Sequence, residues 1–236
     1  MAGLRWLTGI LALLIASFVE ASEPSLFDNQ YSAKLYGFNI LVTSRLSAHE
    51  NGNYQFYFDA KAALGRITET SQFKWNEKDQ QVVPLLYTYK RAGLGKSRDQ
   101  TLNFDWAKHE VTDAQKGTHQ VLDVARKVQD SLSYQVQLRQ DLLAGKKSFH
   151  YAITNGKKFR NYKFEVAGEE VLETPLGKVT AVKVRRIQTS EDRETYAWFA
   201  KDFQYLLVRL QQEENGSAYT IYISKASLNG KAIEHF

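Results

Sequence analysis

The sequence predicts a mainly β fold, a single curved antiparallel sheet or barrel-like fold of roughly ten or more strands with one main amphipathic helix. Two observations favour the sheet: many short segments alternate apolar and polar residues, and Asn-Gly or Pro-containing turns separate them. A third favours the helix, because only one long segment has apolar residues at three- and four-residue spacing. No repeat of fixed period and no linker divides the chain.

The first strands are expected at residues 31–42, 54–64 and 66–75. The turn before the second contains Asn51-Gly52, a common hairpin signal. Within 54–64 the apolar residues share one face and the polar residues share the other, and Gly65 permits a bend into the next strand. This part of the chain is predicted to be a meander of hairpins.

The next strands are expected at residues 82–90 and 100–106. Pro84 lies inside the first of them, and proline has no N–H to donate to a neighbouring strand. This predicts a strand edge, a bulge or a strand start at Pro84.

The helix is expected at about 122–144. Val121, Val128, Leu132, Val136 and Leu143 follow the spacing of one helical face, with a possible break near Asp130 and Ser131. Gly145 is suited to cap the C-terminal end of the helix, and Asp130 is suited to bind the amides of a first helical turn.

Strands resume after the helix, with turns at Asn155-Gly156 and at Pro175-Leu176-Gly177. The segment "YAWFAKDFQYLLVRL" at residues 196–210 carries apolar side chains on odd and even positions alike. A strand with one face in water needs only every second residue to be apolar. A helix, another sheet or a ligand is therefore expected to cover the second face.

Residues 1–21 are typical of a secretory signal peptide, with Arg5 ahead of an apolar run and small residues near Ala21. The apolar run is shorter than the ~20 residues of a spanning helix, so no transmembrane segment is expected in the mature chain. Cleavage after Ala21 would leave one β-rich periplasmic domain at 22–236.

Composition limits the partners of an exported chain. The net charge is +5, and loss of 1–21 leaves it unchanged because Arg5 and Glu20 cancel. The absence of cysteine means that packing rather than disulfides holds the fold, which suits a bacterial periplasm. Export also excludes nucleic acid from the expected partners.

No catalytic or metal-binding pattern is visible. There is no nucleophile elbow and no cysteine, and the five histidines are dispersed, so we expect no cofactor, no metal and no enzymatic activity. Asp59, Asp105 and Asp130 could supply an acid-base pair, but Asp130 is better suited to a helix cap and Asp105 to a turn.

The sharpest charge feature is the segment 146–163, which holds six cations and no acidic residue. A hairpin turning at Asn155-Gly156 would gather these cations at one end and could bind an anionic envelope component. The alternative is a solvated hairpin whose lysines discourage edge pairing. The candidate residues of this patch are Lys146, Lys147, Lys157, Lys158, Arg160 and Lys163.

Aromatic and aliphatic side chains on several predicted elements could line a cavity for an acyl chain or another apolar ligand. The alternative is that they simply form the core. The candidate ligand-binding residues are Tyr54, Phe56, Phe58, Leu132, Val136, Trp198 and Tyr222.

Several segments resemble one known family in the same order along the chain. They are "GNYQFYFDAKAALGRIT", "QQVVPLLYTY", "NFDW", "VQDSLSYQVQLR", "ETPLGKVTAVKVRR" and "TYAWFAKDFQYLLVRL". From about Tyr31 to Ser224 the chain is similar to bacterial exported proteins grouped as domain of unknown function 3108. The resemblance implies a periplasmic, strand-rich, barrel-like fold and supplies no functional residues. The expected architecture is also similar to that of half-barrel periplasmic lipoprotein carriers, a likeness of fold only.

The sequence therefore predicts a non-enzymatic periplasmic protein that binds a lipid-like or amphiphilic molecule in a curved β-sheet cavity, with the helix as a lid or wall. The alternative is an envelope interaction or structural module that docks an anionic partner through the basic hairpin. An enzyme acting on an envelope polymer is a third hypothesis.

Overall fold

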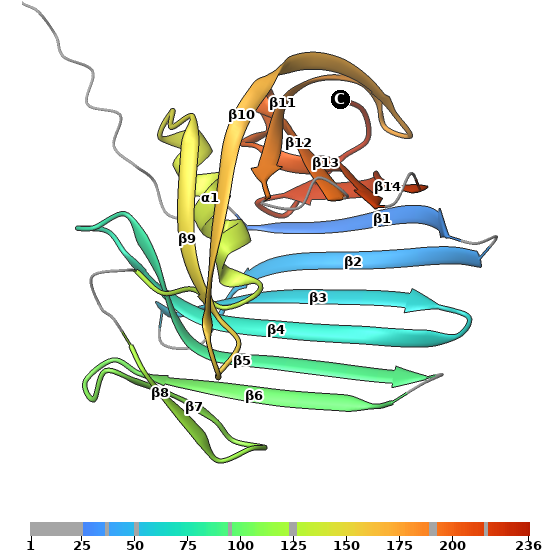
Figure 1. The fold of residues 1–236 in the computed structure, drawn as a ribbon. Coiled ribbons are helices and arrows are strands. Elements are labelled where there is room, and N and C mark those ends of the chain that lie inside the picture. The colour runs from blue at the N-terminus through green and yellow to red at the C-terminus, as the bar shows by residue number, and fades with distance from the viewer. Residues whose placement is uncertain are drawn as a thin grey trace, which may run out of the picture.

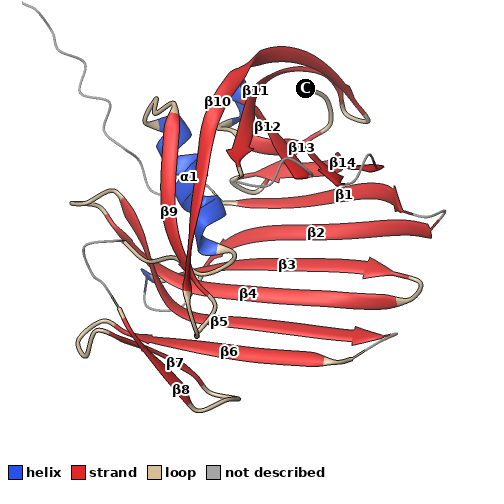
Figure 2. Cartoon of the chain, viewed as in Figure 1, coloured by secondary structure: helices blue, strands red, loops and turns tan. Residues whose placement is uncertain are grey.

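A large antiparallel sheet with a single α-helix forms the protein (Figures 1 and 2). The computed structural model describes residues 26–35, 38–49, 52–93, 96–122, 127–188, 193–214 and 217–236. The predicted signal peptide, residues 1–21, lies outside these ranges. The fold class expected from the sequence is confirmed, because fifteen strands form one sheet that is not closed.

The N-terminal run of strands forms the lower part of Figure 1. Its members are β1 (Phe27–Leu35), β2 (Phe38–Ala48), β3 (Tyr54–Ala62), β4 (Gly65–Asn76), β5 (Gln81–Gly93), β6 (Arg98–Asp105), β7 (Glu110–Asp113) and β8 (Thr118–Val121). Each of these strands pairs with the next, as the predicted meander requires.

The C-terminal run continues the same sheet. Its members are β9 (Ser148–Thr154), β10 (Phe159–Thr174), β11 (Gly177–Ile187), β12 (Arg193–Ala200), β13 (Leu206–Glu214), β14 (Ser217–Leu228) and β15 (Lys231–Ile233), with a 3-10 turn, η3 (Lys201–Phe203), after β12. β14 pairs with β1, which joins the two runs, and the full order is β8-β7-β6-β5-β4-β3-β2-β1-β14-β13-β12-β11-β10-β9, with β15 beside β14.

The ends of the sheet meet without forming a ladder. The β9–β10 turn lies against β6 and β7, where Gln100 Nε2 donates to the Asn155 carbonyl at 2.8 Å and to Asp113 Oδ2 at 2.7 Å. Gly156 in this turn is buried, with φ of +77°. The turn predicted at Asn155-Gly156 is confirmed, and its tip closes the barrel-like shape instead of extending into solvent.

Pro84 lies at a bulge, one of the three positions predicted for it. The β4–β5 register shifts between Gln72 and Phe73, so that Phe73 pairs with Pro84. Pairing of β5 with β6 begins only at Leu86, so β6 requires no donor from Pro84. The Pro84 carbonyl instead accepts from Trp106 Nε1 at 2.6 Å.

The helix α1 (Ser133–Leu143) is shorter than the predicted 122–144 range. The Asp130 carboxylate accepts from the amides of Leu132 and Ser133, as a capping group does at the start of a helix, so the predicted capping role of Asp130 is confirmed. The backbone of Gln129 is not helical because it pairs with β9, donating to Ala152 and accepting from Thr154.

Other parts of the helix prediction have mixed outcomes. Val121 ends β8 and is exposed, so it does not belong to a helical face, and residues 123–126 lie outside the described ranges. The cap at Gly145 is confirmed: its φ is +76°, its amide donates to the Leu142 carbonyl, and the Lys146 amide donates to Asp141, which together form a Schellman motif.

α1 is held inside the curve of the sheet and is buried on more than one side, unlike a helix with one face in water. Its polar side chains are bonded to the surrounding strands. Gln137 accepts from the Val82 amide at 2.7 Å and donates to the Gln80 carbonyl, and Asp141 accepts from the Tyr151 hydroxyl at 2.7 Å. These contacts fix α1 to β5 and β9.

Both faces of the doubly apolar segment are closed by protein side chains. Trp198 and Ala200 pack in one core cluster with residues of β10, β11 and β14, whereas Phe199 packs in another with Leu138 and Leu142 of α1. A bulge in the β12–β13 pairing between Trp198 and Phe199 accompanies this division. β10 bends at Gly168, and the part of β10 beyond this bend reaches β14 (Figure 1). This part of β10 covers the face of the segment that carries Trp198.

Candidate functional site

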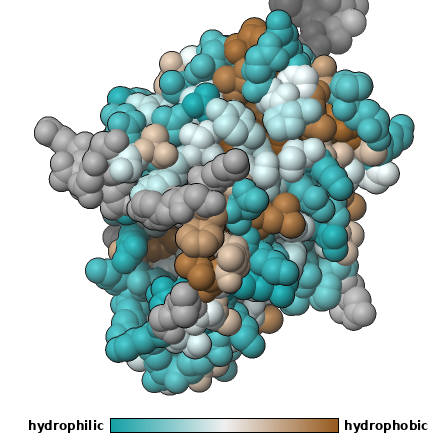
Figure 3. Space-filling model, turned by 90° about the vertical axis from the view of Figure 1, so that its right-hand side faces the viewer, coloured by the Kyte–Doolittle hydropathy of each residue, from teal (hydrophilic) through white to brown (hydrophobic). Residues whose placement is uncertain are grey.

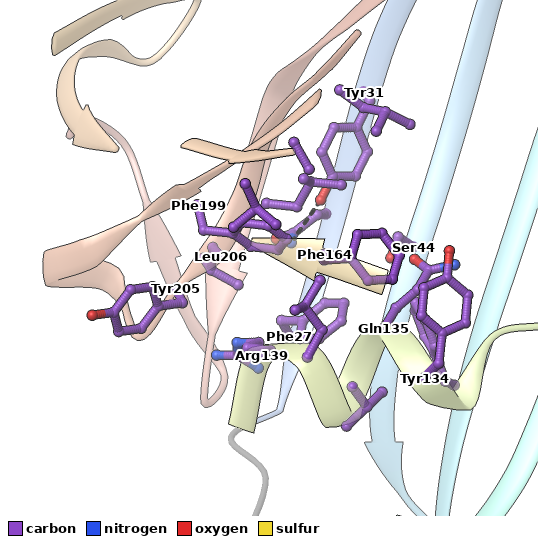
Figure 4. A pocket seen from close by; sticks show the side chains of 18 of the residues that line it. Phe27, Tyr31, Ser44, Tyr134, Gln135, Arg139, Phe164, Phe199, Tyr205 and Leu206 are labelled. Atoms are coloured by element: carbon purple, nitrogen blue, oxygen red, sulfur yellow. Dashed lines mark hydrogen bonds between the residues drawn. The ribbon is translucent and has the colours of Figure 1, made fainter. Parts of the chain in front are cut away.

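An apolar pocket lies between α1 and the strands that curve around it (Figure 4). It encloses about 160 Å³. Its apolar lining comes from β1, β3, α1, β10, β11, β12 and β13, and includes Phe27, Phe56, Leu138, Phe164, Phe199 and Leu206. A dry cavity of about 150 Å³ holds a benzene molecule, so this pocket can hold an apolar group of similar size.

One end of the pocket carries a cation from α1. Arg139 is 4% exposed, its Nε donates to the Gln204 carbonyl at 2.7 Å, and its guanidinium lies 5.2 Å from the centre of the Phe27 ring. Burial lowers the pKa of Arg139 to about 10, while Tyr31 acts in the opposite direction. The guanidinium therefore remains charged at neutral pH, close to the apolar lining.

A different part of the lining is polar and uncharged. Asn29 and Tyr31 lie two residues apart on the inner face of β1, and the Asn29 amide donates to the Tyr31 hydroxyl at 3.3 Å. Ser44 stands directly opposite Asn29 in the β1–β2 register and also lines the pocket. In Figure 4 the hydroxyl of Tyr31 points into the pocket. Burial raises the pKa of Tyr31, so its hydroxyl keeps its proton at neutral pH.

Two of the seven predicted ligand-binding residues, Phe56 and Val136, line this pocket. Tyr54 and Leu132 are buried in the core cluster beside it, and Phe58 packs against that cluster. These three side chains contribute to the core next to the pocket and not to its lining.

Trp198 and Tyr222 lie away from the pocket. Trp198 is 2% exposed, and its Nε1 donates to Glu170 at 2.8 Å. The guanidinium of Arg209 lies 4.2 Å from the Trp198 ring centre and 5.4 Å from that of Tyr222. These aromatic side chains form part of a cation-π stack on the sheet.

Sequence reasoning missed Phe27, Asn29, Tyr31 and Arg139. The alternation of Phe27, Asn29 and Tyr31 along one strand face was a readable signal, with a polar residue between two aromatic ones. Arg139 gave no signal, because a charged residue on a helix is usually placed toward water.

A second, polar groove of about 540 Å³ runs between α1, β9 and the β4–β5 turn. Its central carboxylate, Asp141, accepts from Tyr151, Gln137 and Lys146. The acceptor positions of this carboxylate are thus occupied by protein donors.

The basic segment does not gather all its cations at one end, and that part of the prediction is wrong. Lys147 lies at the end of the β9–β10 hairpin away from the turn, where its carbonyl accepts from the Val166 amide, and Lys146 pairs with Asp141 at 2.7 Å. Lys157, Lys158 and Arg160 are exposed at or near the turn. None of these three forms an ion pair within the described parts of the chain.

The carboxylates considered for acid-base chemistry take part in structural contacts. Asp59 accepts from Arg66 and Thr68, and Asp105 accepts from the Lys108 amide at 3.0 Å, which confirms its predicted role in a turn. Asp130 is buried and accepts from Ser71 at 2.6 Å in addition to the helix amides. Where residues are described, no group of three His, Asp or Glu side chains is placed to hold a metal ion.

Glu69 is a partly buried carboxylate, which sequence reasoning did not single out. It accepts from the Tyr87 hydroxyl at 2.5 Å. Burial raises the pKa of Glu69, and the charge of Asp130 raises it further. The hydrogen bond from Tyr87 lowers this pKa, but the net shift is upward.

Figure 3 shows the face on the right-hand side of Figure 1, away from α1. Hydrophilic side chains cover most of it, and hydrophobic side chains gather in its middle and upper parts. Among the exposed large apolar side chains of described residues, Phe38, Leu41 and Leu64 lie at one end of neighbouring strands, and Val121, Val171 and Ile187 lie on other strands. Within the described ranges, no helix has the length and apolar character needed to cross a membrane.

Comparison with known proteins gives a family and a fold. Residues 30–224 match the family described as "Protein of unknown function (DUF3108)". The fold is similar to that of a crystal structure of a β-barrel-like protein of domain of unknown function DUF1849 from Brucella abortus, with 8% sequence identity and a TM-score of 0.59. The similarity covers 89% of this chain and all of that one. No curated protein matches the chain.

Proposed function

The chain belongs to the DUF3108 family of proteins of unknown function, and from that premise we propose that it is a non-enzymatic periplasmic protein that binds an amphiphile of the cell envelope. In this proposal the pocket between α1 and the sheet holds an apolar group of the ligand. The family and the barrel-like fold supply no activity, so the proposal depends on the site.

The observation that carries the proposal is the apolar pocket of about 160 Å³ in the interior of the fold. Protein interiors are normally packed with few voids larger than a water molecule. An apolar pocket of this size is therefore available to a ligand without rearrangement of the core.

The size of the pocket limits the ligand. A benzene-sized space takes about six carbon atoms, which at ~0.8 kcal/mol each give a gross gain of about 5 kcal/mol. After ordering costs, this gain supports a dissociation constant of about a millimolar or weaker from apolar burial alone. A full-length acyl chain does not fit, so the ligand is a small amphiphile or inserts only part of a longer chain.

α1 acts as a wall in this proposal and not as a mobile lid. Gln137 of α1 accepts from the backbone of β5, and Arg139 donates to the backbone of the turn before β13. Asp141 accepts from the Tyr151 hydroxyl of β9. Opening the pocket by moving α1 would break these buried hydrogen bonds together.

NMR titration of the mature protein with benzene and with small amphiphiles at millimolar concentrations tests the proposal, because a ligand held this weakly does not survive purification. We expect saturable shifts of signals from residues that line the pocket, and Ala197→Leu, which extends a side chain into the pocket, should lose them. Absence of saturable binding by benzene and by the amphiphiles would show that the pocket binds nothing.

A second candidate function rests on Lys157, Lys158 and Arg160. These exposed cations lie at or near a turn that Gln100 and Asp113 hold against the rest of the sheet. Because the backbone of the turn is already held in place, only the side chains of these cations lose freedom on binding an anionic envelope component.

A further inference from the structure

The polar part of the pocket has a hydrogen-bonding requirement that the protein does not meet by itself. Asn29 is 1% exposed, and its Nδ2 donates to the Tyr31 hydroxyl (Figure 4, dashed line). Its Oδ1 is buried and has no hydrogen-bond partner in the described parts of the chain. The Tyr31 hydroxyl can pair with only one of the two polar atoms of the amide, so the other needs a partner from outside.

An unsatisfied amide atom in a folded core is costly, and such atoms are normally bonded to protein, water or ligand. Asn29 lies on the wall of the apolar pocket, where a bound molecule can reach it. We therefore expect a molecule in the pocket to donate a hydrogen bond to Asn29 Oδ1.

We propose that this part of the pocket binds the hydroxyl group of a small, uncharged alcohol or phenol. The ligand hydroxyl donates to Asn29 Oδ1 and accepts from the Tyr31 hydroxyl, while its apolar body lies among Phe164, Phe199 and Leu206. This inference rests on the proposed ligand-binding function and names the chemical class of the ligand.

The donor and acceptor pattern selects a hydroxyl over a carboxylate and over a hydrocarbon. A carboxylate is acceptor-only and would leave Asn29 Oδ1 without a donor, and a hydrocarbon has no polar atom to offer. A hydroxyl is both donor and acceptor, which matches the two groups present. The raised pKa of Tyr31 keeps its hydroxyl protonated and thus able to donate.

The cation in the pocket offers a competing way to bind a head group. Arg139 lies beside Phe27 and could attract a carboxylate. A carboxylate bound to Arg139 would offer no donor to Asn29 Oδ1. Arg139 on the one hand and Asn29 with Tyr31 on the other therefore predict different head groups on the same apolar ligand body.

Three probes of one ring size separate these possibilities: benzene, phenol and benzoate. Their dissociation constants would be measured by calorimetry or NMR titration for the unmodified protein and for Asn29→Leu and Tyr31→Phe. Thr43→Val is the matched control, because Thr43 lies on β2 next to Ser44 but points to the opposite face.

We expect phenol to bind more tightly than benzoate. In Asn29→Leu the ratio of the phenol to the benzene dissociation constant should rise about tenfold, since the phenol hydroxyl then enters an apolar site. Tyr31→Phe should raise this ratio by a smaller factor, and Thr43→Val should leave it unchanged. Tyr31→Phe still provides the test if Asn29→Leu fails to fold.

Failure of this inference differs from failure of the proposed function. If none of the three probes binds, the pocket is closed and both proposals fail. If benzene binds but both variants leave the phenol-to-benzene ratio unchanged, the pocket binds ligands and the hydroxyl assignment is wrong. Tightest binding of benzoate would also overturn the assignment and identify Arg139 as the group that contacts the ligand head.

Discussion

Gly156 at the tip of the β9–β10 hairpin lies directly against Leu102 of β6, so that a Cβ atom built on Gly156 would stand 2.6 Å from Leu102 Cδ2. The two residues come from opposite ends of the sheet order, and their contact closes the barrel-like shape. Glycine is therefore required at position 156 for two reasons: the turn approaches Leu102 closely, and the φ of +77° is unfavourable for other residues.

Gly156→Ala should reduce the free energy of unfolding by about 2 kcal/mol more than Gly230→Ala. Gly230 has the same φ of +77° but no heavy atom within 4 Å of a built Cβ, so it carries the backbone strain without the clash. Urea denaturation of both variants measures the difference. Equal losses in the two would mean that the tip moves away from Leu102 at no cost.

Gln100→Met should loosen the same closure. The change removes the donor to the Asn155 carbonyl and to Asp113 while keeping a side chain of similar length. Loss of these hydrogen bonds should lower stability by about 1–3 kcal/mol. Hydrogen exchange should accelerate in the β9–β10 turn and much less in β1 and β2. Uniform acceleration across the sheet would contradict a local closure.

Ala197→Leu should fill part of the pocket and abolish ligand binding with little loss of stability, because the added carbons enter existing space. Ala200→Leu on the same strand is the control. Ala200 is fully buried and does not line the pocket, so overpacking there should cost about 1–3 kcal/mol. Thermal unfolding and benzene titration distinguish the two. A large loss of stability in Ala197→Leu would mean that the pocket has no usable space.

Glu69→Gln should change how stability depends on pH. The pKa of Glu69 is raised in the folded protein, so the folded state binds the proton more tightly than the unfolded state, and the resulting stabilisation is present at low pH and is lost as pH rises. Glutamine does not titrate and still accepts from Tyr87. The melting temperature of Glu69→Gln relative to the unmodified protein should therefore rise between about pH 4 and pH 8. A constant difference would show that Glu69 titrates normally.

Reversal of Lys157, Lys158 and Arg160 to Glu should remove salt-sensitive binding to vesicles that contain phosphatidylglycerol, if the hairpin turn docks an anionic partner. Lys225→Glu with Lys231→Glu is the control, since both lysines are exposed on other strands. Cosedimentation at low and high salt measures the effect. Equal binding by the reversed and control variants would exclude the turn as the docking site.

The amino-acid sequence by itself determined the elements of this protein. Period-two alternation, the Asn-Gly turns and Gly145 act locally, so β3 to β6, the turn at Gly156 and the end of α1 were predicted correctly, whereas β7 and β8 were missed. The family resemblance was also readable, because its segments occur in order along the chain.

Only the tertiary structure decided where the helix begins and which side chains meet at the pocket. Residues 127–132 have helical spacing, but Gln129 pairs with β9, which is distant in sequence, and this contact outweighs local propensity. Trp198 and Phe199 point to opposite faces, as strand alternation requires, but only the tertiary structure shows that the pocket lies on the side of Phe199. Asn29 and Arg139 become neighbours of one cavity only because β1 and α1 lie on opposite sides of it in the curled sheet.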